Sequence, residues 1–217
     1  MIFVKLCGIR RMEDAQVAIE AGANALGFNF WKGTPRYISP PEAARIIATV
    51  PPSIWRVGVF VDEDPQRVFQ IAAETGISAL QFHGSESAKY LDQLGPYEKI
   101  KVFKVGTGFE PEQLRPYRSA SAFLLDSFAA GLPGGTGKTF DWSQAIRAKE
   151  YGRIILAGGL RPQNVEEAIQ QVRPWGVDVS SGVETEPGKK NPKLIQDFIE
   201  VVRRVEKFFE EEKPLTI

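Results

Sequence analysis

Cysteine and histidine are almost absent from this sequence. Its 217 residues include one Cys and one His. A single Cys excludes an intramolecular disulfide framework, and one Cys with one His leaves no CxxC pair, HExxH motif or histidine cluster for zinc. We therefore expect no metal site, and a soluble cytoplasmic protein in a reducing compartment.

An excess of either charge is also missing, as are long apolar runs. The 27 Lys+Arg balance 27 Asp+Glu, which argues against a nucleic-acid partner because such proteins usually carry a basic excess. No stretch approaches the ~20 apolar residues that span a bilayer, and the apolar start at 1–6 is too short for a signal peptide. Without a linker or low-complexity segment, we expect one domain over 1–217 with a frayed tail at 210–217.

Short apolar runs rich in β-branched residues alternate with helical stretches about eight times. The predicted strands are Ile2–Cys7, Ala25–Asn29, Arg56–Val61, Ala79–His83, Lys99–Lys104, Ala122–Asp126, Ile154–Ala157 and Gly176–Val179. Eight βα units in one chain favour an α/β fold of the single-domain (β/α)8 TIM-barrel type over an open doubly wound sheet.

Helix start and stop signals separate these strands. The predicted caps and helix openings are Ser39 with Glu42, Asp64, Ser85, Asp141 and Arg161–Pro162, and the terminating glycines are Gly22 and Gly76. The last helix should run from about 192 to 210, with an apolar stripe that includes Phe208.

Strand alternation predicts which side chains enter the barrel. The fully apolar set of each strand should face the helices, and the other set should point inward. The inward polar set comprises Lys5, Cys7, Gln81, His83, Asp126, Asp178 and Ser180. Most lie near the carboxyl ends of their strands, where barrel active sites form, and Lys5 can pair with Asp178.

Glycine-containing loops follow the last two strands. Gly158 and Gly159 follow strand seven, and Ser180, Ser181 and Gly182 follow strand eight. Backbone N–H groups in such loops bind phosphate in many barrels. The segment 134–139 looks like a P-loop, but Leu132 stands where that motif requires glycine, so we interpret it as a loop over the active site.

Seven short motifs occur in order along the chain. They are Lys5–Gly8, Thr34–Ile38, Gln81–Gly84, Leu125–Ser127, Gly135–Trp142, Leu156–Leu160 and Asp178–Glu184. Together they resemble the motifs of the phosphoribosylanthranilate isomerase family of tryptophan biosynthesis, over most of the chain.

The resemblance implies a cofactor-free and metal-free barrel that performs an Amadori rearrangement of N-(5'-phosphoribosyl)anthranilate. It implies Cys7 as general base, Asp126 as general acid and Arg36 as the contact for the anthranilate ring and carboxylate. It also assigns the loops after strands seven and eight to phosphate. We further expect the inward residues of the same mouth to bind substrate, namely Lys5, Gln81, His83 and Asp178.

Other functions remain open at this point. A histidine-pathway aminoaldose isomerase performs the same rearrangement but carries an Asp where this chain has Cys7. A lyase could use Lys5 to form a Schiff base with its substrate, and a non-catalytic barrel could bind a phosphorylated ligand.

The expected partner is a small phosphorylated molecule, with no nucleic acid and no membrane. The protein should be a monomer or a homodimer, with the loop around Phe30 and Trp31 as one candidate contact.

Overall fold

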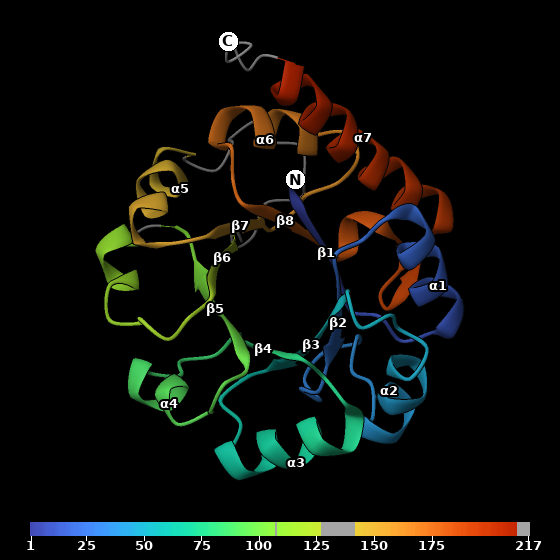
Figure 1. Ribbon diagram of the computed structural model, residues 1–217, viewed down its shortest axis with the longest axis vertical. Coiled ribbons are helices and arrows are strands. Elements are labelled where there is room, and N and C mark those ends of the chain that lie inside the picture. Colours follow the sequence, from blue (N-terminus) through green and yellow to red (C-terminus); the bar gives the residue numbers. More distant parts are fainter. Residues whose placement is uncertain (107, 127–141, 212–217) are drawn as a thin grey trace.

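A closed barrel of parallel strands organises the part of the chain that the computed structural model describes, namely residues 1–106, 108–126 and 142–211 (Figure 1). The barrel strands follow one another in sequence order around the ring. They are β1 (Phe3–Cys7), β2 (Ala25–Asn29), β3 (Trp55–Phe60), β4 (Ala79–Phe82), β5 (Glu98–Lys104), β6 (Ala122–Asp126), β7 (Ile154–Ala157) and β8 (Gly176–Val179). Each predicted strand is present within one residue at either end, and pairing of β1 with β8 closes the ring. The predicted barrel fold is therefore confirmed.

Helices surround the barrel in an outer layer. They are α1 (Met12–Ala21), α2 (Pro40–Ile47), α3 (Pro65–Thr75), α4 (Ala88–Asp92), α5 (Trp142–Ala148), α6 (Val165–Val172) and α7 (Pro192–Glu211). Three short 3-10 helices complete the set, namely η1 (Pro111–Leu114), η2 (Lys149–Tyr151) and η3 (Ser181–Val183). Among the described residues between β5 and β6, η1 is the one helical segment, and no α-helix of the kind that a regular repeat predicts is present there. None of the described helices is long and apolar enough to cross a bilayer.

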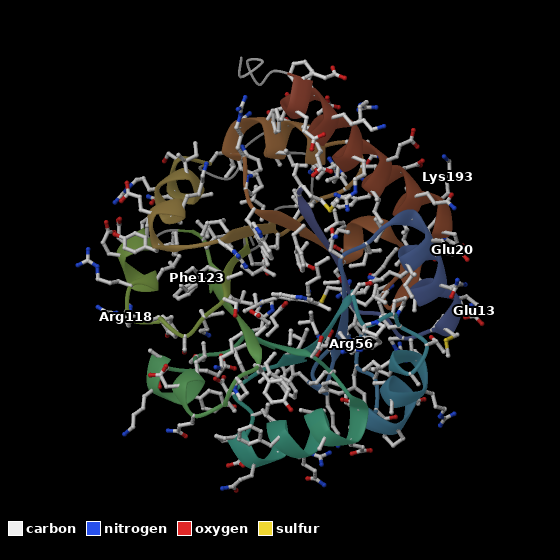
Figure 2. The ribbon with its side chains drawn as sticks, in the orientation of Figure 1. Glu13, Glu20, Arg56, Arg118, Phe123 and Lys193 are labelled. Atoms are coloured by element: carbon white, nitrogen blue, oxygen red, sulfur yellow. The ribbon has the colours of Figure 1, made fainter. Side chains whose placement is uncertain are left out.

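Strand alternation sorts the side chains as predicted. The outward set packs with the helices in one continuous core that includes Val4, Leu6, Leu80 and Phe82. The inward set forms a separate cluster that includes Phe3, Val57 and Leu124. Charged side chains such as Glu13, Glu20 and Lys193 project from the outer helices (Figure 2). The two apolar clusters thus lie on opposite faces of the same sheet.

Aromatic rings occupy the amino-terminal end of the barrel interior. Phe3 stacks on Trp175 with ring centroids 4.4 Å apart and meets Trp55 edge-on at 5.2 Å. Such pairs stabilise a core beyond the area that they bury. Because large side chains occupy this end, a ligand has to enter at the carboxyl ends of the strands.

Local capping confirms most of the predicted helix boundaries. Ser39 and Glu42 form the predicted capping box, and Asp64 accepts from the Gln66 amide at 2.8 Å. Gly22 and Gly76 end their helices in the left-handed conformation, with φ of 95° and 73°.

Three terminal details differ from the prediction. Ser87, not Ser85, caps α4 by accepting from the Tyr90 amide at 3.2 Å. The helix expected from Arg161–Pro162 begins only at Val165, after Asn164 has accepted the Arg161 amide at 2.8 Å. Phe208 is 51% exposed, so it lies outside the buried stripe of α7. Asp141 and 212–217 lie outside the described residues, and fraying of the tail remains a prediction.

A buried ion pair ties the barrel to the loop after β4. The Lys101 ammonium on the outer face of β5 lies 2.8 Å from Glu86, and both side chains are almost completely buried. Glu86 also accepts the backbone amides of Asp62 at 2.8 Å and Gly84 at 3.1 Å. The pair therefore holds together the loops that follow β3 and β4, next to His83.

We expect Lys101→Met to lower the free energy of unfolding by about 3–5 kcal/mol, since it leaves the Glu86 carboxylate buried without its cation. Denaturant unfolding measures the change. Lys193→Met is the matched control, because Lys193 pairs with Asp197 at the surface and is 74% exposed. That control should lose less than ~1 kcal/mol. Equal losses in the two variants would contradict the stabilising role of the buried pair.

Candidate active site

A buried ion pair lies at the seam where the barrel closes. Lys5 of β1 and Asp178 of β8 are register partners, and the Lys5 Nζ lies 2.8 Å from the Asp178 carboxylate. Burial alone would lower the pKa of Lys5, but the charges of Asp178 and Cys7 outweigh it and raise that pKa. Lys5 is therefore a fixed ammonium inside the barrel, as its inward position predicted.

Cys7 is the next inward residue of β1, and its thiol is buried. Burial raises the pKa of the Cys7 thiol, while the neighbouring Lys5 ammonium acts in the opposite direction through charge and a hydrogen bond. Gly27 of β2 leaves room for both groups, because a Cβ there would lie 2.9 Å from the thiol sulfur and 3.1 Å from the Lys5 nitrogen. The absence of a side chain at Gly27 thus allows the thiol and the ammonium to be neighbours.

Asp126 and His83 form the second part of the site. Asp126 ends β6 and His83 follows β4, and His83 Nε2 lies 3.4 Å from Asp126 Oδ2. Both side chains are partly exposed, at 30% for His83 and 19% for Asp126. Strands β7 and β8 lie between β6 and β1, so this pair faces Cys7 from another side of the same mouth.

Gln81 also points into the barrel from β4. It is buried, and its side-chain oxygen has no hydrogen-bond partner among the described residues. Leaving a buried acceptor unpaired costs about 1–3 kcal/mol. Such an atom is a candidate for contact with a polar ligand.

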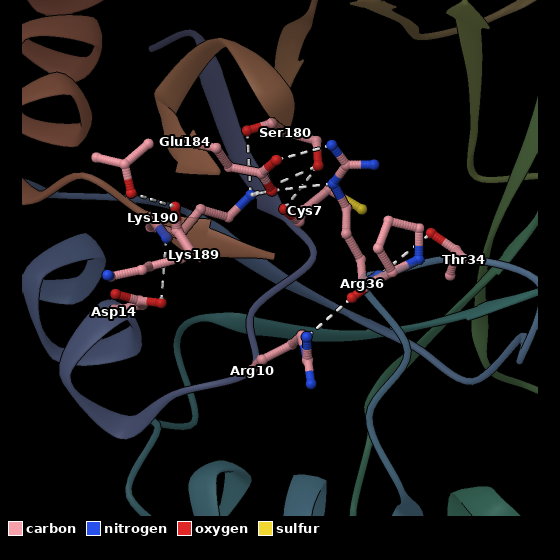
Figure 3. A network of polar contacts seen from close by, with 11 residues as sticks. Cys7, Arg10, Asp14, Thr34, Arg36, Ser180, Glu184, Lys189 and Lys190 are labelled. Carbon is pink, nitrogen blue, oxygen red and sulfur yellow. Dashed lines mark hydrogen bonds and ion pairs between the residues drawn. The ribbon is translucent and has the colours of Figure 1, made fainter. Parts of the chain in front are cut away.

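Arg36 lies in the loop after β2, and its side chain lies close to Gly8. Figure 3 shows Arg36 joined to Glu184 by dashed lines. A Cβ at Gly8 would lie 2.8 Å from the Arg36 side chain, and Gly8 has a φ of +79° that favours glycine. Two hydrogen bonds join the Arg36 guanidinium to the Glu184 carboxylate, at 2.9 and 2.7 Å. These hydrogen bonds to Glu184 raise the pKa of Arg36, although burial opposes them.

The loops after β7 and β8 contact each other. Gly158 and Gly159 have φ of +82° and +67°, and a Cβ at Gly182 would overlap the Leu160 carbonyl oxygen at 1.8 Å. The Ser180 hydroxyl donates to the Cys7 carbonyl at 3.1 Å, so the second loop also adjoins β1. Ser181 opens η3 in the same loop. The residues expected to bind phosphate are therefore adjacent in space.

The structure brings the predicted site residues to one end of the barrel and adds others. Sequence reasoning gave no role to Glu184, Lys190 or Gly27. Glu184 lies two residues after Gly182, and its place in the last motif is the signal that could have identified it. Ser127 and most of the motif Gly135–Trp142, like the glycine-rich segment 134–139, lie outside the described residues. Their expected place over the site remains a prediction.

Comparison with known proteins matches this architecture to one family. The family model for N-(5'-phosphoribosyl)anthranilate (PRA) isomerase matches residues 4–201. A protein of Desulforudis audaxviator named N-(5'-phosphoribosyl)anthranilate isomerase is 50% identical over 207 residues, which cover 94% of this chain and 98% of that protein.

Solved structures of the same family resemble this barrel. Phosphoribosyl anthranilate isomerase from Thermotoga maritima is 41% identical and superposes with a TM-score of 0.85, covering 94% of this chain and all of that one. An isomerase structure in complex with reduced 1-(o-carboxyphenylamino)-1-deoxyribulose 5-phosphate has a TM-score of 0.82 at 38% identity, over the same shares. A third structure contains monomers of the dimeric Thermotoga maritima enzyme, with a TM-score of 0.81, 38% identity and the same coverage. A barrel with this site and these relatives belongs to the phosphoribosylanthranilate isomerase family of tryptophan biosynthesis.

Proposed function

We propose that this chain converts N-(5'-phosphoribosyl)anthranilate into 1-(2-carboxyphenylamino)-1-deoxyribulose 5-phosphate, with Cys7 as general base and Asp126 as general acid. The observation that carries the assignment is the placement of these groups on β1 and β6, at the carboxyl ends of the same barrel. A sugar bound across the mouth would have one group on each side.

The first step opens the furanose ring. Asp126 gives a proton to the ring oxygen as the bond from that oxygen to C1' breaks, and the anilino nitrogen supplies the electron pair that forms the C1'–N double bond. His83, 3.4 Å away, lies where it can orient the Asp126 carboxyl. The product of this step is an open-chain Schiff base.

The second step moves the proton from C2'. The Cys7 thiolate removes it, the electron pair forms the C1'–C2' double bond, and the protonated imine nitrogen accepts the other pair to give an enolamine. That enolamine becomes the ketone when C1' takes up a proton and the hydroxyl on C2' releases one. Burial raises the pKa of the Cys7 thiol, and the Lys5 ammonium opposes that effect, so Lys5 is the group that favours the thiolate needed for this step.

Binding groups surround the reacting atoms. Arg36 suits the anthranilate carboxylate because its planar fork donates two parallel hydrogen bonds. The Gln81 oxygen is available for a substrate hydroxyl, and Lys5 and Asp178 hold the thiol environment. The phosphate would bind the backbone N–H groups of the loops after β7 and β8, because barrels commonly bind phosphate there. The residues concerned are Gly158, Gly159, Ser180, Ser181 and Gly182.

The chemistry of Lys5 argues against a Schiff-base lyase. An amine must lose its proton to attack a carbonyl, and desolvation or a nearby cation usually achieves this. Here the pKa of Lys5 is raised, because the Asp178 and Cys7 charges outweigh the lowering effect of burial. Lys5 also donates a hydrogen bond to the Asp178 carboxylate at 2.8 Å, so its ammonium is held by that ion pair.

We place the enzyme in the cytoplasm, as a monomer or a homodimer that acts on a small phosphorylated substrate. A reducing compartment keeps the single thiol available as a base.

Cys7→Ala should lower kcat by about 10²–10⁴-fold, the usual contribution of one general acid–base group, and leave KM nearly unchanged. Consumption of the fluorescent substrate measures both constants. Thermal unfolding of the variant serves as the control for folding. A loss of less than tenfold in kcat would remove Cys7 from the role of base.

Titration of the thiol tests the environment of Cys7 directly. Because this is the only cysteine, thiolate absorbance in the ultraviolet follows Cys7 alone once the Cys7→Ser spectrum is subtracted. Burial raises the pKa of Cys7, so the midpoint should lie above the ordinary value of about 8.5. Lys5→Gln should move it higher still, because the lowering effect of the ammonium is lost. A midpoint that fell in Lys5→Gln would contradict the proposed stabilisation of the thiolate.

Arg36→Ala should raise KM by about ten- to a hundredfold, since hydrogen bonds to a charged group contribute ~1.5–3 kcal/mol. The change in kcat should be smaller, because the carboxylate does not react. Steady-state kinetics separates the two constants. A large fall in kcat at unchanged KM would show that Arg36 acts in the chemical step instead.

A further inference from the structure

The Arg36 guanidinium has two edges that can each donate two parallel hydrogen bonds. Its Nε and one Nη2 hydrogen face Glu184, at 2.9 and 2.7 Å. Nη1 makes no hydrogen bond or ion pair with any residue that the structure describes. One edge is therefore occupied by the protein, and the edge formed by Nη1 and the remaining Nη2 hydrogen stays available.

Glu184 is itself held from the other side. Its Oε1 accepts from the Lys190 ammonium at 2.8 Å as well as from Arg36 Nε, and its side chain is 4% exposed. Lys190 is fully buried and also donates to the Ser180 carbonyl at 3.1 Å. Glu184 begins β9 (Glu184–Glu186) and Lys190 ends β10 (Lys189–Lys190), so the small hairpin after β8 delivers both groups (Figure 3).

The charges around Glu184 keep its carboxylate ionised and paired with Arg36. A guanidinium paired only with a carboxylate would be neutral and would attract a second carboxylate weakly. Lys190 adds a second cation behind Glu184; burial lowers the pKa of Lys190, and the hydrogen bond and charge of Glu184 oppose that effect. Asp14, which accepts the Lys190 amide at 3.5 Å, adds a carboxylate on the far side of Lys190, so the contact for an anion is the free edge of Arg36 and not a net charge of the cluster. Burial would raise the pKa of Glu184, but the hydrogen bonds from Arg36 and Lys190 outweigh it and lower that pKa, so the carboxylate stays ionised.

We propose that Glu184 is a positioning residue that fixes which edge of Arg36 meets the carboxylate of the substrate, with Lys190 anchoring Glu184. Without Glu184 the guanidinium can rotate on its flexible stem, and its fork is no longer preorganised for a planar bidentate contact. The inference rests on the proposed function, in which Arg36 binds the anthranilate carboxylate.

The test is a double-mutant cycle on KM. Glu184→Gln should raise KM for N-(5'-phosphoribosyl)anthranilate by about tenfold and change kcat by less than about threefold, because the effect is on uniform binding. In the Arg36→Ala background the same substitution should change KM by less than about twofold, since residues that act through one contact are not additive. If Glu184 only stabilised the fold, its substitution would lower the amount of active enzyme in both backgrounds. KM does not depend on that amount, so KM would stay unchanged.

The hairpin offers a matched control. Glu186 lies two residues along β9, is exposed and pairs with Lys189 at the surface, so Glu186→Gln should leave KM unchanged. If Glu184→Gln does not fold, Glu184→Asp keeps the charge but retracts the carboxylate, and its rise in KM should likewise vanish in the Arg36→Ala background.

The outcomes separate the two claims. An equal effect of Glu184→Gln in both backgrounds, or no effect while Arg36→Ala raises KM strongly, would overturn the positioning role and leave the proposed function intact. An Arg36→Ala variant with unchanged KM would overturn the Arg36 contact, and with it this inference.

Discussion

The pairing of Lys5 with Asp178 is the interaction on which the site depends. It joins the first and last strands of the barrel at 2.8 Å, inside an apolar cylinder where a single charge would be strongly destabilising. Because each partner needs the other, the pair fixes the register at the seam and places an ammonium one inward position below Cys7. The thiol therefore lies in a buried position. The adjacent strand β2 leaves room for it, because Gly27 has no side chain there. Barrel closure and the environment of the thiol have the same physical origin.

The polar groups around this pair differ in their exposure to solvent. The thiol is buried beside a cation, whereas Asp126 and His83 are partly exposed on the far side of the mouth. In the proposed mechanism, proton donation by Asp126 and proton removal by Cys7 would therefore occur in separate places. The proposed contact for the substrate carboxylate lies apart from both, at Arg36, where Arg36 and Lys190 share the Glu184 carboxylate.

Prediction from the sequence succeeded where local physics decides the structure. Period-two alternation identified the inward residues of β1, β4, β6 and β8, and left-handed glycines identified the ends of α1 and α3. It failed where a distant group decides. Ser85 would be a good cap, but the Asp62 carboxylate accepts its amide at 2.6 Å within a bend, and α4 starts only after Ser87. In the fifth unit, residues 111–114 form a single 3-10 turn where a regular repeat predicts an α-helix. Apolar periodicity does not distinguish such a turn from a short α-helix.

The sequence by itself determined the barrel class, the inward face of each strand and the set of motifs that places the chain in its family. These follow from short-range patterns, since side-chain direction in a strand depends only on position. The tertiary structure alone decided how distant segments complete each other. Arg36 and Glu184 are 148 residues apart, and their pairing exists only because closure of the ring brings the loop after β8 beside the loop after β2. The β9–β10 hairpin that carries Glu184 and Lys190 has too few residues to show a pattern, and it is stabilised by those contacts themselves.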